Sequence, residues 1–276
     1  MSYSRRLDLE PADALRAWVP LLVLLGSIVA VGLFAQPLVA AILLLVLLAG
    51  VGISVSRRAP AAWSWASAVP AAAIVVIRSF GPGINRWDAG SCSVTASQPV
   101  LWSLGEAAVV VASTMVLAVV LNARSTETGL RWPAGYAVRW AALGTVAILA
   151  GGLAAVMLLG GPLFGVDHVS VGGFAFLVPA VLFAVAVAVS EEVAWRGALQ
   201  GWLGRLLGGF LGTLAQACLY GTWWGIALGS TLGGVIAGAA GLLLGAIVLR
   251  TRSVVVVIAW HAAFNVAFYV LMACRG

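Results

Sequence analysis

Hydrophobic residues in this chain stand in long continuous runs, separated by short polar connections. About 20 apolar residues cross the ~30 Å hydrocarbon core of a bilayer as a helix, so each run predicts one membrane-spanning helix. The runs lie near residues 17–35, 37–56, 61–80, 100–121, 138–160, 174–202, 209–227, 231–249 and 254–273. This pattern predicts an all-α, polytopic transmembrane helix bundle of eight or nine spans.

The run at 61–80 is the weakest of these predictions. It contains Trp63, Trp65 and Pro70, which favour a kinked helix or one that lies in the membrane interface. An interfacial position for this segment is the alternative that reduces the count to eight spans.

Composition supports lipid as the solvent for most of the chain. Hydrophobic residues make up 63% and charged residues only 9% of the sequence, and the mean hydropathy is +1.10. A soluble domain of this size carries far more charge. The net charge of +6 comes from arginines in short connections, which is typical of membrane orientation rather than of nucleic-acid binding.

The arginines also predict an orientation. They gather in alternate connections, before the first run and after the second, fourth, sixth and eighth runs, whereas Arg78, Arg86 and Arg275 depart from this rule. We therefore expect an integral protein of the cell membrane with its N-terminus in the cytoplasm. Glycines spaced four residues apart between Gly225 and Gly245 predict close helix packing there.

Ionisable side chains at membrane depth are energetically expensive and are functional candidates by default. The candidates within the runs are Glu106, Glu191, Glu192, Arg196 and His261. Glu106 fits either an interfacial or internally bonded residue or, together with Glu191, the proton path of a transporter. The sequence does not show the paired broken helices in matching halves that inverted-repeat transporters have, which counts against a transporter.

Spacing predicts how these groups pair. Glu192 and Arg196 are four residues apart and share a helix face, so we expect an ion pair. Glu191 is rotated by ~100° from Glu192 and should point elsewhere, as suits a general base. The alternative is that this cluster merely marks the end of a span.

Two further pairs of residues lie four apart, on the seventh and the last runs. These are Tyr220 with Trp224, and His261 with Asn265. Their depths are comparable with that of Glu191 at ~1.5 Å of rise per residue. We expect Glu191, His261 and Asn265 to line one cavity with Trp224 at its wall.

With these residues, the chain resembles the CAAX prenyl protease and bacteriocin-processing (CPBP, Abi) family of intramembrane endopeptidases. The family motif Glu-Glu-x-x-x-Arg stands here as Glu191 to Arg196, and His-x-x-x-Asn stands as His261 to Asn265. The family's middle motif, Phe-x-x-x-His, is replaced by a segment running from Tyr220 to Trp224. The resemblance makes residues 174–276 a CPBP-like core and leaves 1–173 as N-terminal transmembrane helices of unassigned role.

The resemblance also implies roles for these residues. Glu191 would activate water, while Glu192 and Arg196 would help to hold it. His261 would position the water or a metal, and Asn265 would stabilise the oxyanion. Tyr220 and Trp224 would contact the substrate. No metal is expected, because a catalytic zinc usually takes three protein ligands, and Glu191, Glu192 and His261 are the only side chains that could serve. A zinc site is the alternative.

The function implied is an intramembrane endopeptidase that cleaves a membrane-associated protein or peptide. The alternative is a catalytically degenerate relative that binds such a peptide, or a partner membrane protein, as a scaffold. Trp224 in place of histidine keeps this alternative open, because an indole offers one N–H donor and no basic nitrogen.

The predicted orientation can be tested with the cysteines. It places Cys92 and Cys274 on the outer side of the membrane, and we expect Cys218 to be buried. A membrane-impermeant thiol reagent added to intact cells under reducing conditions should therefore label Cys92. Labelling of Cys92 only after lysis would show that the orientation is the reverse of the predicted one.

Overall fold

The computed structural model describes residues 18–34, 36–80, 97–164 and 174–273, and within these ranges the chain is helical without β-strands. The predicted all-α bundle is therefore confirmed. The elements are α2 (Val19–Phe34), α3 (Pro37–Ser56), α4 (Ala62–Phe80), α5 (Ser97–Val120), α6 (Ser125–Thr128), α7 (Gly135–Phe164), α8 (Phe174–Glu191), the π-helix η2 (Glu192–Gln200), α9 (Gly201–Leu207), α10 (Gly209–Ala227), α11 (Thr231–Thr251) and α12 (Val255–Ala273).

Each predicted run coincides with a helical segment in the described part of the chain. Six of these segments are long and apolar enough to cross a membrane, namely 37–56, 62–80, 100–120, 135–154, 177–207 and 231–251. Two shorter apolar helices cover 19–34 and 255–267. Helix α10 is in neither group, and it carries the polar residues Gln216 and Tyr220 in its middle.

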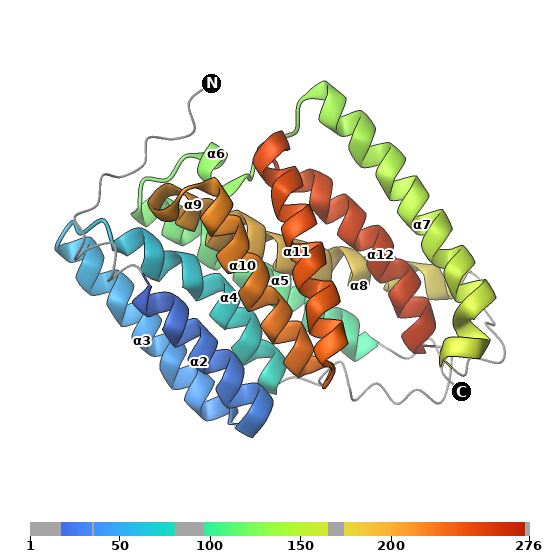
Figure 1. The fold of residues 1–276 in the computed structure, drawn as a ribbon, viewed down its shortest axis with the longest axis horizontal. Coiled ribbons are helices and arrows are strands. Elements are labelled where there is room, and N and C mark those ends of the chain that lie inside the picture. Colours follow the sequence, from blue (N-terminus) through green and yellow to red (C-terminus); the bar gives the residue numbers. More distant parts are fainter. Residues whose placement is uncertain (1–17, 35, 81–96, 165–173, 274–276) are drawn as a thin grey trace.

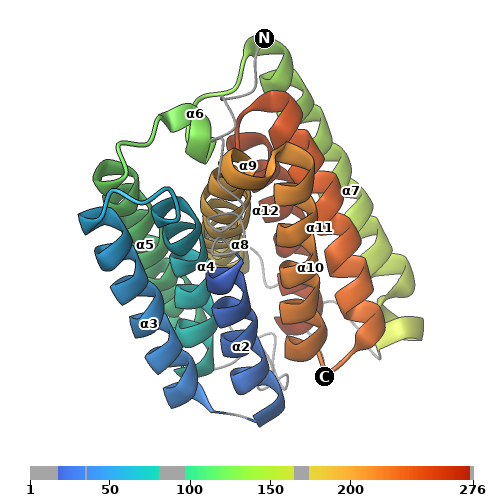
Figure 2. The same cartoon turned by 60° about the vertical axis from the view of Figure 1, so that its left-hand side comes forward.

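Two groups of helices flank a central element (Figure 1, Figure 2). Helices α2 to α5 lie on one side and α7, α10, α11 and α12 on the other, with α8 between them. Helix α8 packs against α5 and α12, and η2 packs against α4 and α10. The segment that carries the first motif is therefore in contact with both groups of helices.

Helix α4 lies inside the bundle and not along its edge. It packs against α2, α3, α5, α9 and η2. Its buried face is built from small residues, including Ala66, Ser67, Ala71 and Ala72, which let neighbouring helix backbones approach closely in lipid. This packing does not support the alternative that residues 61–80 lie in the interface.

The turn between α11 and α12 is tied to the segment before α7. The guanidinium of Arg131 donates to the Arg252 carbonyl at 2.9 Å, and the Ser253 hydroxyl donates to the Arg131 carbonyl at 2.7 Å. The Val254 amide donates to the Gly129 carbonyl at 3.0 Å. These bonds fix the start of α12, the helix that carries the histidine of the last motif.

One expectation about the cysteines is wrong. Cys218 is exposed on α10 rather than buried, because it lies on the face of the helix opposite to Tyr220 and Gln216, which turn inward. Cys92 and Cys274 lie outside the described residues, as does His168, the second histidine of the chain besides His261.

Helices α10 and α11 approach so closely that a single methyl group would separate them. A Cβ atom on Gly221 would lie 2.8 Å from the Gly234 carbonyl and 3.0 Å from the Gly238 Cα. A Cβ atom on Gly234 would in turn lie 2.8 Å from the Gly225 Cα. The predicted packing role of the spaced glycines is thus confirmed at this interface.

We expect Gly221→Ala to destabilise the folded protein, because the added methyl group meets backbone atoms that cannot rotate away. The loss should be about 1–3 kcal/mol, as is typical of overpacking. Thermal unfolding in detergent measures it. Gly52→Ala, on a helix position with nothing within 4 Å, is the matched control. Equal stability of the two variants would contradict the close approach of α10 and α11.

Candidate active site

The first motif spans a change of helix type at the centre of the bundle. Glu191 is the last residue of α8, and the nine residues from Glu192 to Gln200 form a π-helix, all of them buried. π-Helical turns are rare in proteins overall, and many of those that occur lie at functional sites. Gly201 follows directly, and a Cβ atom there would overlap the Glu127 carbonyl of α6. The backbone of α6 therefore packs directly on the end of the π-helix.

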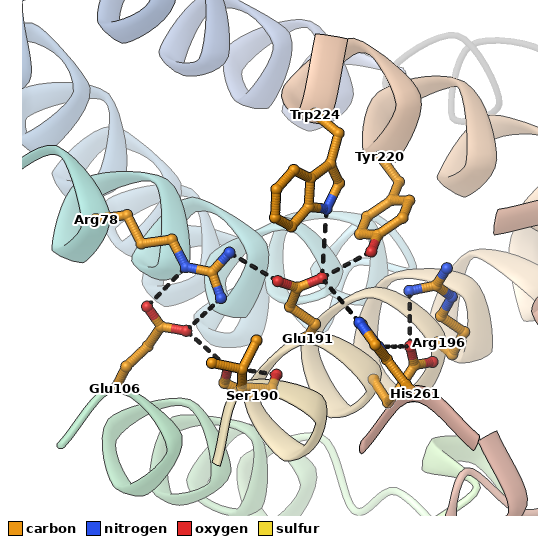
Figure 3. Close-up of polar contacts among 10 residues, drawn as sticks. Arg78, Glu106, Ser190, Glu191, Arg196, Tyr220, Trp224 and His261 are labelled. Atoms are coloured by element: carbon orange, nitrogen blue, oxygen red, sulfur yellow. Dashed lines mark hydrogen bonds and ion pairs between the residues drawn. The ribbon is translucent and has the colours of Figure 1, made fainter. Parts of the chain in front are cut away.

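Glu192 lies between a guanidinium and an imidazole. Its Oε1 atom accepts from Arg196 Nη1 at 3.1 Å and lies 2.7 Å from His261 Nδ1. The predicted ion pair of Glu192 with Arg196 is confirmed. Because an ionised carboxylate can only accept, Nδ1 of His261 carries the hydrogen. The remaining ring nitrogen, Nε2, is turned toward Glu191 (Figure 3).

Glu191 points away from Arg196, as the helical rotation predicted. Its Oε1 atom accepts from Arg78 Nη1 at 2.7 Å. Its Oε2 atom accepts from the Tyr220 hydroxyl at 2.7 Å and from the Trp224 indole at 3.4 Å, and lies 3.9 Å from His261 Nε2. The carboxylate is fully buried, so all these partners come from the protein (Figure 3).

Arg78 and Ser190 are site residues that the sequence analysis did not identify. Arg78, from the last turn of α4, binds Glu106 of α5 through two nitrogens, at 2.9 Å and 2.8 Å, and Glu191 through the third. The Ser190 hydroxyl donates to Glu106 at 2.6 Å. One sign of Arg78 was present in the sequence, because this residue does not lie in the alternate connections where most of the arginines gather. Glu106 is internally bonded, which was one of its two interpretations.

The predicted convergence is confirmed for Glu191 and His261, which come from α8 and α12 and approach to 3.9 Å. Trp224 lies against the same carboxylate oxygen, as expected for a residue at the edge of the site. Tyr220 is buried, and its hydroxyl faces Glu191. Asn265 lies one turn beyond His261 and is buried, and its Nδ2 atom has no partner among the described residues. Its approach to Glu191 stays a prediction.

Within the described part of the chain, the glutamates of this site lie beside arginines. Within the described residues, no group of three or more His, Cys, Asp or Glu side chains could hold one. Arg78 and Arg196 are already paired with Glu191 and Glu192, and their positive charges would repel a cation. The arrangement instead offers a buried carboxylate beside an oriented imidazole, which together can move a proton and position a water molecule.

Comparison with known proteins assigns this segment. Residues 173–267 match the family model described as type II CAAX prenyl endopeptidase Rce1-like, and both outer motifs lie inside the matched range. Neither the curated proteins nor the solved structures contain a match. The matched segment and the multi-helix bundle agree on an integral membrane protein. Residues 173–267 are therefore similar to the CAAX prenyl protease and bacteriocin-processing family of intramembrane endopeptidases.

Proposed function

We propose that this protein is an intramembrane endopeptidase that cleaves a membrane-associated protein or peptide, with Glu191 as the general base. The observation that carries the proposal is the 3.9 Å separation between Glu191 Oε2 and His261 Nε2. This distance is too long for a direct hydrogen bond. It allows one water molecule beside the pair to contact both atoms.

In the proposed reaction His261 Nε2 accepts one hydrogen bond from the water, and Glu191 Oε2 removes its other proton. The hydroxide oxygen then attacks the scissile carbonyl carbon. As the C–N bond breaks, the proton held on Glu191 passes to the leaving amine. Glu192 keeps the imidazole in the required tautomer, since its Oε1 atom accepts from Nδ1 on the far side of the ring. Arg196 donates to the same oxygen and so holds Glu192 in place.

Asn265 supplies the oxyanion donor in this proposal. Its buried Nδ2 has no hydrogen-bond partner within the described residues, and such an unpaired donor on the helix of His261 is suited to a developing negative charge. No step requires a metal. The protein would lie in the cell membrane with its N-terminus in the cytoplasm, as the distribution of arginines favours.

Trp224 controls access to the base in this scheme. Its contact with Glu191 Oε2, at 3.4 Å, is longer than that of Tyr220, at 2.7 Å. Water therefore reaches this oxygen most easily by displacing the indole. The side chain is half-buried and so is free on one side to contact a peptide.

A binding scaffold is the second candidate function, and one observation favours it. Arg78, Tyr220 and Trp224 together occupy both oxygens of Glu191, and an indole stands where the family motif has an imidazole. In a scaffold this network would be permanent. Trp224 would then form the wall of a groove for a membrane peptide.

Glu191→Ala should abolish cleavage, because it removes the proposed base. The expected fall in rate is ~10²–10⁴-fold. A co-expressed library of membrane-anchored reporter peptides, analysed by mass spectrometry, gives the measurement. Cys218→Ala, on the exposed face of α10, is the control and should cleave like the native protein. Unchanged cleavage by Glu191→Ala would refute the assignment of the base.

Trp224→His separates the two candidate functions. In an endopeptidase limited by the missing imidazole, this change should raise turnover of the same reporter peptides, by up to the ~10²–10³-fold that one preorganised group provides. In a scaffold it should weaken peptide binding, measured by cross-linking in membranes, and create no hydrolysis. Absence of cleavage by the native, Glu191→Ala and Trp224→His forms would favour the scaffold.

A further inference from the structure

Arg78 uses every nitrogen of its guanidinium inside the bundle. Nε and Nη2 bind the two oxygens of Glu106 at 2.9 Å and 2.8 Å, and Nη1 binds Glu191 Oε1 at 2.7 Å. The Arg78 side chain is only 9% exposed. A planar fork of this kind fixes direction as well as charge, which a lysine ammonium cannot do.

Glu106 ties this fork to the backbone next to Glu191. Its Oε1 atom accepts from Arg78 and also from the hydroxyl of Ser190, at 2.6 Å, and Ser190 precedes Glu191 in the chain. The ring of contacts is therefore closed, from Arg78 through Glu106 and Ser190 to Glu191 and back. Rotation of the Glu191 carboxylate would break its bond with Arg78.

The consequence lies in which oxygen of Glu191 faces the imidazole. Arg78 holds Oε1 on the side of α4, so Oε2 is the atom that faces Tyr220 and His261 (Figure 3). We propose that Arg78, held by Glu106, is a positioning residue that orients Glu191 for its role as base. This inference rests on the proposed endopeptidase function.

The same geometry gives the N-terminal helices a part in the site. Arg78 lies on α4 and Glu106 on α5, and both are outside the segment, residues 173–267, that matches the family. The family segment supplies base, imidazole and amide, and the first part of the chain supplies the residue that orients the base. A working site therefore needs helices from both parts.

The test uses the full-length protein and compares kcat with KM on a cleaved reporter peptide. The paired change Arg78→Met with Glu106→Gln removes one positive and one negative charge together, so the net charge of the buried cluster is kept. Because misplacement of a catalytic group by about 1 Å can lower the rate ~10²-fold, kcat should fall by about that factor while KM changes little. Arg78→Lys should retain folding and give an intermediate kcat.

The matched control is a second arginine–glutamate pair away from the site. Arg205 and Glu127 lie 2.8 Å apart between α9 and α6, and Arg205→Met with Glu127→Gln should leave kcat near the native value. Thermal unfolding in detergent confirms that each variant is folded. Native kcat in a folded Arg78→Met, Glu106→Gln variant, or an Arg78→Lys variant equal to native, would overturn the proposal.

Infrared spectroscopy decides the inference if the native protein cleaves none of the reporters and the proposed function fails. The difference between the native and Glu191→Gln spectra isolates the carboxylate stretch of Glu191. This band should shift in Arg78→Met with Glu106→Gln and stay in place in the Arg205 and Glu127 control. A band that does not respond to the loss of Arg78 would show that Arg78 does not orient the carboxylate.

Discussion

Buried charges between membrane-spanning helices must be paired, and the arrangement of this protein depends on that constraint. Two arginines, Arg78 and Arg196, lie against three glutamates, Glu106, Glu191 and Glu192. Removing one partner of a buried pair costs about 3–5 kcal/mol, because the other charge is left without compensation. Helices α4, α5, α8 and η2 are therefore held together by charge as well as by packing.

The change from α-helix to π-helix distributes these charges over two directions. Glu191 ends α8 and faces α4 and α10, whereas Glu192 begins η2 and faces Arg196 and the imidazole of α12. Adjacent carboxylates in one apolar site would repel each other if both faced the same way. Each instead has its own arginine, and His261 lies between them.

This division of partners supports different roles for the two carboxylates. Glu192 has one oxygen engaged by Arg196 and His261, which is suited to holding an imidazole. Glu191 has one oxygen fixed by Arg78. Its other oxygen accepts from Tyr220 and, at a longer distance, from Trp224. In the proposed reaction, access of water to Glu191 depends on how readily the indole moves, whereas in a scaffold the indole would stay in place.

Much of the fold and the motif geometry was predictable from the sequence alone. Continuous apolar runs identified the helices, because lipid requires the backbone to bond within each span. The four-residue spacing of Glu192 and Arg196 predicted their ion pair, and the motifs predicted that His261 would approach Glu191. These inferences depend on local helical geometry and on the cost of charge in hydrocarbon, and both can be evaluated along the chain.

Only the tertiary structure showed what Glu191 contacts. Arg78 is 113 residues away in the sequence, and nothing in the spacing relates it to Glu191. Its departure from the arginine rule marked it as unusual without naming a partner. The exposed side of Cys218 was likewise undetermined, because a helix with apolar residues on all sides does not reveal which face its neighbours cover. Helix-to-helix pairing in a membrane is decided by packing and charge compensation between distant segments, and so it is visible only once the helices are assembled.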